Sequence, residues 1–128
     1  MDPDFDGAEL PLPSREELEA GENLDGLTEE QLETFRRRAV SQPAASVRQA
    51  AELRHDARLD IPSTVICTGA SSDQVKAWAE EGYPWLAGLS ELRDVTWVDL
   101  PTSHWPMWSR PQELAAIIGD VAKAHGTD

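Results

Sequence analysis

Two short runs rich in β-branched and apolar residues constrain the fold of this chain more than any other feature. The first covers residues 61–69 and ends at a glycine, and the second covers residues 95–100. Such runs, without regular polar alternation, are typical of strands that are covered on both faces. About 25 largely helical residues separate them, which is enough for a crossover connection. The sequence therefore predicts a right-handed βαβ unit with two parallel strands.

A helix with clear end signals is expected before the first strand, at residues 27–40. Thr28 is placed as its N-cap, and Gln31 stands at the position that completes a capping box. Acidic residues open this helix and three consecutive arginines close it, an order that suits the helix dipole. The arginines are therefore better explained as a solvated helix end than as an anion site.

Two further helices are predicted, one after each strand. Ser71 or Ser72 can cap the first of them, and Gly82 can end it. The second opens with Pro111, a residue favoured at the first helical position, and ends before Gly126. The predicted fold class is therefore α/β, a short parallel sheet with flanking helices.

The acidity of the chain is concentrated at its N-terminus. The net charge is −13, and the first 33 residues hold 12 of the 24 acids and one of the 11 basic residues, a net of −11. Residues 1–26 combine acids with prolines and glycines and show no periodicity, so we expect a disordered or extended lead-in. An acidic chain without a basic stripe is a poor partner for nucleic acid or an anionic membrane.

The single cysteine, Cys67, excludes an intrachain disulfide and favours a reducing compartment. It lies within the first apolar run, where a small core side chain is expected rather than a reactive thiol. No run reaches the roughly 18 apolar residues of a membrane helix, and the acidic N-terminus does not resemble a signal peptide. We therefore expect a cytoplasmic protein without a membrane partner.

His104 lies on the loop between the second strand and the last helix. That loop leaves the carboxyl edge of a parallel sheet, where α/β proteins bind ligands and position reacting groups. A histidine there can take a proton from a nucleophile and pass it to a leaving group, because imidazole ordinarily titrates near neutral pH. The alternative is a histidine that ties down its own loop by hydrogen bonds. His55, in a polar stretch, is expected to be exposed.

The segment from the second strand to the last helix resembles the C-terminal end of the α/β-hydrolase fold. In that family the last strand runs into a Gly-His or Ser-His pair, and the final helix often begins with Arg-Pro-Glu-Glu. Here Ser103 and His104 stand in the first place, and residues 110–113, Arg-Pro-Gln-Glu, stand in the second. Residues 61–69 resemble the penultimate strand, and residues 24–40 resemble part of the cap that some bacterial members insert before it.

The resemblance covers most of residues 24–124 and implies a partial α/β-hydrolase domain at 27–125, the C-terminal half of an esterase-like enzyme. It implies that His104 is the histidine of a catalytic triad, acting as base and then acid in acyl transfer through a serine ester. The implied substrate is a small ester or amide, with no cofactor and no metal ion. The implied partner is a complementary hydrolase half or a second copy of the chain. The competing hypothesis is a truncated relative without enzymatic activity, which binds another protein by strand addition.

The other two members of a triad match the family less well. Its acid usually follows the penultimate strand in a Gly-x-x-Asp turn, and Asp73 stands four residues past Gly69. Asp73 is explained equally well as a complement to the dipole of the next helix, and Asp99 is a weaker substitute. The Gly-x-Ser-x-Gly elbow of the nucleophile is missing. Ser71 comes nearest to it, but helix capping explains Ser71 better, so we expect the chain alone to hydrolyse esters poorly.

The five tryptophans divide into two groups. Trp78, Trp85 and Trp97 fit core or helix-packing positions. Trp105 and Trp108 flank the histidine on its loop, where they either wall an acyl or aromatic pocket or pack the loop onto the sheet.

Overall fold

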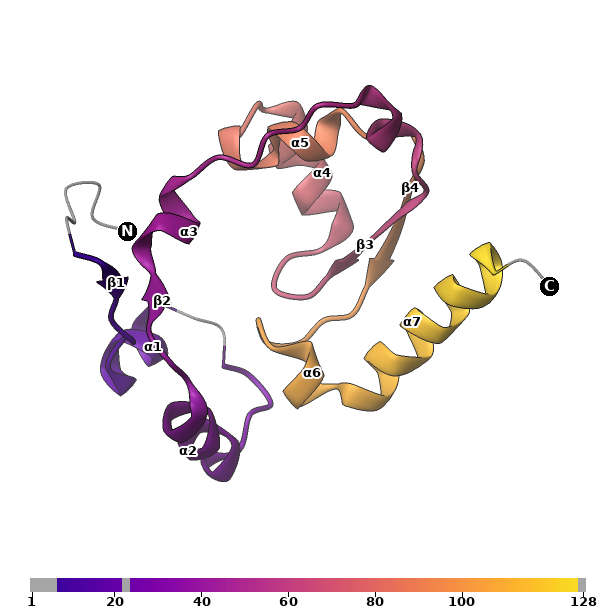
Figure 1. Cartoon of the computed structure of the whole chain (residues 1–128). Coiled ribbons are helices and arrows are strands. Elements are labelled where there is room, and N and C mark those ends of the chain that lie inside the picture. The colour runs from indigo at the N-terminus through magenta and orange to yellow at the C-terminus, as the bar shows by residue number, and fades with distance from the viewer. Residues whose placement is uncertain (1–6, 22–23, 127–128) are drawn as a thin grey trace. The chain divides into compact units, whose positions relative to one another are not determined.

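The computed structural model of the chain describes residues 7–21 and 24–126. The chain divides into two compact units (Figure 1). The first takes in the residues up to 22 together with 28–54, and the second takes in 23–27 together with 55–128. This division falls within the stretch 27–125 that the sequence assigned to one domain.

The first unit combines three short helices with a two-stranded antiparallel ribbon. In the ribbon Glu9 lies opposite Pro43, and Leu10 lies opposite Gln42. The elements of this unit, in chain order, are β1 (Glu9–Leu10), α1 (Arg15–Gly21), α2 (Glu29–Arg38), β2 (Gln42–Pro43) and α3 (Ala44–Arg48). In α2 the predicted helix and its capping box are both confirmed.

The strand β1 and the helix α1 lie in the stretch 1–26, for which the sequence predicted no regular element. The helix forms because Ser14 and Glu17 make a capping box. The backbone N–H of Ser14 donates to the Glu17 carboxylate at 2.7 Å, and the N–H of Glu17 donates to the Ser14 hydroxyl at 3.2 Å. Leu18 is then buried within the unit. Residues 1–6 and 22–23 of the expected lead-in lie outside the described residues.

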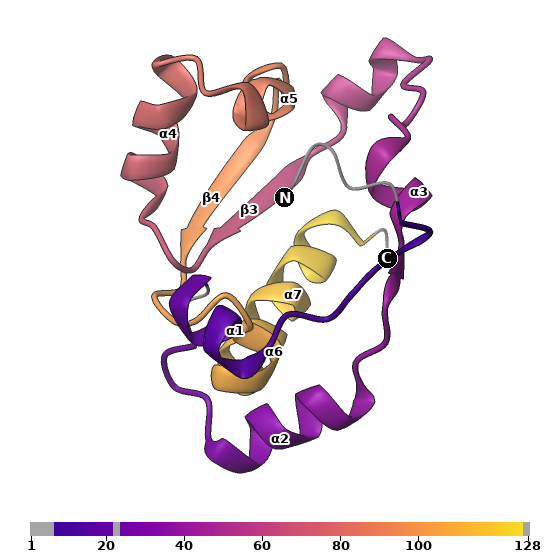
Figure 2. The same ribbon diagram turned by 90° about the vertical axis from the view of Figure 1, so that its left-hand side faces the viewer.

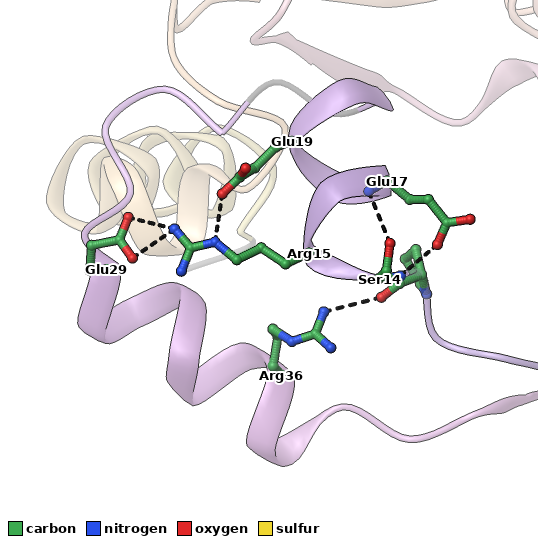
Figure 3. Close-up of polar contacts among 7 residues, drawn as sticks. Ser14, Arg15, Glu17, Glu19, Glu29 and Arg36 are labelled. Carbon is green, nitrogen blue, oxygen red and sulfur yellow. Dashed lines mark hydrogen bonds and ion pairs between the residues drawn. The ribbon is translucent and has the colours of Figure 1, made fainter.

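Arg15 connects α1 to α2 (Figure 3). Its guanidinium lies 2.6 Å from the carboxylate of Glu19 in α1 and 2.8 Å from that of Glu29 at the start of α2. Arg36, near the end of α2, donates a hydrogen bond to the carbonyl of Pro13 at 3.2 Å. These side chains are exposed, so their contacts orient the two helices and add little stability.

The second unit is built around two parallel strands. Ser63 lies opposite Val95 at one end of the pair, and Cys67 lies opposite Asp99 at the other. The predicted parallel strand–helix–strand arrangement is therefore confirmed. The elements, in chain order, are η1 (Asp56–Asp60), β3 (Ser63–Cys67), α4 (Ser72–Glu80), η2 (Pro84–Leu86), α5 (Ala87–Ser90), β4 (Val95–Asp99), α6 (Pro106–Ser109) and α7 (Pro111–His125).

Helices flank both faces of the β3–β4 pair (Figures 1 and 2). On one face the ammonium of Lys76 in α4 lies 5.2 Å from the ring centroid of Trp97. On the other face Val98 of β4 and Val121 of α7 help to line a groove of about 350 Å³. Within β3 only Cys67 is fully buried. The pair is therefore less covered than its apolar runs predicted, because α7 does not close over the sheet.

Gly82 ends the helix α4, as the sequence predicts. Gly82 has φ 80°, and its N–H donates to the carbonyl of Ala79 while the N–H of Tyr83 donates to that of Trp78. This is the Schellman arrangement, completed by a contact between the Trp78 and Tyr83 rings at 6.4 Å. Of the two positions predicted for Trp85, core or helix packing, the core position is wrong. Trp85 is 67% exposed, and its ring packs against the ring of Trp78 in α4 at a centroid distance of 6.0 Å.

Candidate functional site

The carboxyl edge of the β3–β4 pair carries the residues singled out from the sequence. Backbone pairing continues beyond the strands there, because the N–H of Leu100 donates to the carbonyl of Cys67 at 2.8 Å and that of Thr102 donates to Thr68 at 3.2 Å. The loop that follows β4 is thus attached to the loop that follows β3. Residues at this edge are held by the sheet and not by a free loop.

His104 lies on the loop after β4, with its side chain exposed. Its ring meets the ring of Trp105 edge to face, at a centroid distance of 5.4 Å and an angle of 80°. Within the described residues no hydrogen bond or ion pair joins the imidazole to a carboxylate. The ring is therefore accessible at the carboxyl edge and does not tie down its own loop.

Ser103, the residue before His104, holds the loop by hydrogen bonds instead. Ser103 is 0% exposed, and its hydroxyl accepts a hydrogen bond from the N–H of Trp105 at 3.1 Å and donates one to the hydroxyl of Ser109 at 2.9 Å. Trp105 and Trp108 are half-buried on the same loop. Side chains on both sides of His104 are therefore packed, while His104 itself faces solvent.

Asp73, the proposed triad acid, leaves the same edge of the sheet at the start of α4 but makes no contact with His104. Its side chain is 93% exposed and lies 3.7 Å from the ammonium of Lys76. An exposed pair of this kind adds little stability and competes only weakly with another partner. The position of Asp73 in the first turn also suits the helix dipole.

The other two candidates are engaged in helix capping. Asp99 accepts hydrogen bonds from both the N–H and the hydroxyl of Ser72. Ser71 is the N-cap of α4, and its hydroxyl accepts from the N–H of Gln74 at 3.3 Å. The structure therefore brings Asp99 to Ser72, and it gives Ser71 the capping role that the sequence favoured for it.

An open polar cleft of about 400 Å³ lies at the same edge. It is lined by Thr68 and Thr102 from the two strand-end loops, by Arg110, and by the turn at Asp25 and Gly26. The turn closes through a hydrogen bond from residue 27 to residue 24, and Gly26 at φ 79° supplies the conformation it requires. His104 and Asp73 do not line the cleft. An arginine, an aspartate and two threonines therefore line the cleft, and the Thr102 hydroxyl is also bonded to Ser109.

Arg110 forms a hydrogen bond with the helix that it precedes, α7. Its Nη1 donates to Glu113 at 2.9 Å, and this contact is the main reason why the pKa of Glu113 is lowered. Arg110 thus lines the cleft and also stabilises the start of α7.

The hydroxyl residues that build the loop around His104 were not singled out from the sequence. The signal was present, since Thr102, Ser103 and Ser109 stand within eight positions around a proline-led turn. Hydroxyl residues in such turns commonly bond to nearby backbone groups. What the sequence did not show was that the three hydroxyls bond to one another.

Other kinds of site find no support in the described part of the chain. No three His, Cys, Asp or Glu side chains gather there in a way that would hold a metal ion, and no helix there combines the length and apolarity needed to cross a membrane. Comparisons of the chain with family models, with curated proteins and with solved structures found no match.

Proposed function

We propose that this chain supplies the histidine-bearing carboxyl edge of a serine-dependent hydrolase of the α/β-hydrolase kind. The observation that carries the proposal is the location of His104. It is an exposed imidazole on a packed loop, five positions after the end of the second of two parallel strands that are flanked by helices. The resemblance of Ser103-His104 and of residues 110–113 to the hydrolase pattern supports the same role.

In this function His104 acts on a serine that lies outside these 128 residues. The imidazole accepts the serine proton as the oxygen attacks the acyl carbon of an ester or amide, and then gives the proton to the departing alcohol or amine. Water repeats the sequence on the acyl-serine and regenerates both groups. Ser71 does not serve as the nucleophile, because its hydroxyl caps α4.

Asp73 is the proposed acid, which would hold the tautomer of His104 by a hydrogen bond. This role requires Asp73 to leave its pair with Lys76, which is exposed and weak. Asp99 is the less suitable candidate, since losing Asp99 from the start of α4 would leave the N–H of Ser72 without its acceptor.

The second candidate function is a protein-interaction module. It is favoured by the two-stranded sheet, in which β3 and β4 each have one edge unpaired within the described residues. The apolar Val65 and Ile66 of β3 are only half-buried. An extended segment could add to the edge of β3 through backbone hydrogen bonds. The same edge would receive the preceding strand of a hydrolase sheet, so edge binding alone does not separate the two functions.

The test is reconstitution with a segment that carries a Gly-x-Ser-x-Gly elbow and the strands that precede the penultimate strand in an α/β-hydrolase. The chain is co-purified with this segment, and hydrolysis of p-nitrophenyl butyrate is measured. We expect turnover that requires the elbow serine, and a loss of about 10⁴-fold in kcat in His104→Ala, as when a triad member is removed elsewhere. His55→Ala is the matched control, because His55 is also exposed, and it should retain full activity.

Two results would count against the hydrolase function. One is a stable complex, with the elbow serine in place, that shows no turnover; this favours the interaction module. The other is serine-dependent turnover that His104→Ala leaves unchanged. Comparison of Asp73→Asn with Asp99→Asn in an active complex then identifies the acid by the larger loss of kcat.

A further inference from the structure

The hydroxyls of Thr102, Ser103 and Ser109 form a cluster beside His104, on the segment that connects β4 to α7. The Oγ atom of Ser109 is 2.7 Å from the hydroxyl of Thr102, 2.9 Å from that of Ser103 and 3.2 Å from the carbonyl oxygen of Trp105. All of these contacts are part-buried. Ser109 is therefore the common partner of groups on both sides of His104.

The direction of these hydrogen bonds follows from counting protons. A hydroxyl has one proton to donate, and a carbonyl oxygen can only accept. Ser109 therefore donates to Trp105 and accepts from Ser103. By the same count Thr102 is the donor in its 2.7 Å contact with Ser109. Ser109 thus accepts two hydrogen bonds and donates one.

These bonds close a ring around Trp105. Its N–H donates to the hydroxyl of Ser103, Ser103 donates to Ser109, and Ser109 donates back to the carbonyl of Trp105. The N–H belongs to the peptide group between His104 and Trp105, so the ring fixes the plane of the peptide that follows His104. Hydrogen bonds in a chain strengthen one another in a poorly solvated site.

We infer that Ser109 is a positioning residue for His104. It holds the backbone on the C-terminal side of His104 and, through Ser103, the backbone on the N-terminal side, so that the exposed imidazole leaves the loop in one direction. The inference rests on the proposed function, since positioning matters only if His104 must meet a reacting group. A misplacement of about 1 Å can cost about 100-fold in rate.

The first test uses the chain alone. In Ser109→Ala we expect amide exchange of the Trp105 N–H to become about ten-fold faster. We also expect the NMR shifts of the His104 ring protons, which the nearby Trp105 ring displaces, to move toward their values in Trp105→Leu. Ser103→Ala removes the adjoining link and should have the same two effects. Ser63→Ala is the control, because its hydroxyl donates only to the carbonyl of Ile61 at 3.0 Å.

The second test uses the reconstituted hydrolase. Ser109→Ala should lower kcat about 10- to 100-fold while KM stays within about two-fold, since positioning of the base affects the chemical step. An active complex in which Ser109→Ala leaves kcat unchanged overturns the inference, as does unchanged exchange at Trp105 in both serine variants. If amide exchange at Trp105 becomes faster in Ser109→Ala but the reconstituted complex shows no turnover, the hydrolase function is overturned while the hydrogen-bonded ring is supported.

Discussion

The carboxylate of Asp99 accepts two hydrogen bonds from Ser72, one from the backbone N–H at 2.6 Å and one from the hydroxyl at 3.0 Å. Asp99 is the last residue of β4 and Ser72 is the first of α4. The contact therefore joins the end of one strand to the start of the helix that leaves the other strand. A carboxylate is favoured there by the free N–H groups and the dipole of the helix.

Replacing Asp99 should destabilise the second unit. Asp99→Ala should lower the free energy of unfolding by about 1–2 kcal/mol, since hydrogen bonds to a charged group are stronger than neutral ones and this one is partly exposed. Ser72→Ala should cost less, because the backbone N–H still has its acceptor. Urea denaturation measures both, with Asp94→Asn as a control expected to lie within about 0.5 kcal/mol of the unchanged chain. Equal stability of Asp99→Ala and Asp94→Asn would contradict the proposed link.

Two glycines in the second unit should respond to alanine in opposite ways. Gly82 ends α4 at φ 80°, a conformation that costs a residue with a Cβ about 1–2 kcal/mol. Gly88 lies in α5, and an added Cβ would meet no atom within 4 Å. Gly82→Ala should therefore lower the melting temperature, and Gly88→Ala should leave it unchanged or raise it. Circular dichroism during thermal unfolding measures both melting temperatures. A lower melting temperature in both variants would contradict this prediction.

The thiol of Cys67 should be unreactive in the folded chain. Burial, and to a lesser extent the charge of Asp99, raises the pKa of Cys67. The Cys67 thiol therefore stays protonated in the folded state at a pH where it has begun to lose its proton in the unfolded state. Stability that depends on this proton is present below the ordinary thiol pKa, and it is lost as the pH rises through the higher folded-state value. Cys67→Ala should lose less stability than the unchanged chain between neutral pH and alkaline pH.

The same thiol gives a direct chemical readout. Labelling by iodoacetamide at pH 8 should be at least about ten-fold slower in the native chain than in urea. Equal rates in the two conditions would show that Cys67 is accessible in the native state.

The capping box of α1 should make that helix sensitive to acid. Hydrogen bonds with Ser14 lower the pKa of the Glu17 carboxyl group. The bond with the backbone N–H of Ser14 contributes most, and the bond with the Ser14 side chain contributes less. The contribution of Glu17 to stability is thus complete above its ordinary pKa, and it is lost as the pH falls through the lowered value. Glu17→Gln should reduce the difference in helix content between pH 7 and pH 3, measured by circular dichroism. Glu16→Gln, in the same first turn, is the control and should keep the full difference.

Much of the second unit could be predicted from local patterns. The apolar runs indicated β3 and β4, and their separation indicated parallel pairing. Ser71 with Gln74 marked the start of α4, and Gly82 marked its end. These predictions succeed because a cap or a glycine acts within a few residues of its own position.

The misses share a different cause. The Ser14–Glu17 capping box was present in the sequence, but acids and prolines around it suggested disorder, and the pairing of β1 with β2 spans more than 30 residues. The short helix α6 was expected to be loop, because a single turn of four residues closed by backbone hydrogen bonds leaves no periodic pattern in the sequence. Trp85 was expected in the core or against a helix, and the structure places it against Trp78 with 67% of the residue exposed.

The sequence by itself determined the order β3, α4, β4 and α7, the caps of α2 and α4 and the location of His104 after β4, because each of these depends on residues that are close together in the chain. Only the tertiary structure decided that Asp99 meets Ser72, that Asp73 points to solvent, and that Ser109 closes a ring around Trp105. The contact of Asp99 with Ser72 depends on strand pairing, because 27 positions separate the two residues, whereas the ring around Trp105 is local and depends on how the turn between Ser103 and Ser109 folds. Side chains separated along the sequence meet only when that pairing brings their backbones within hydrogen-bonding distance.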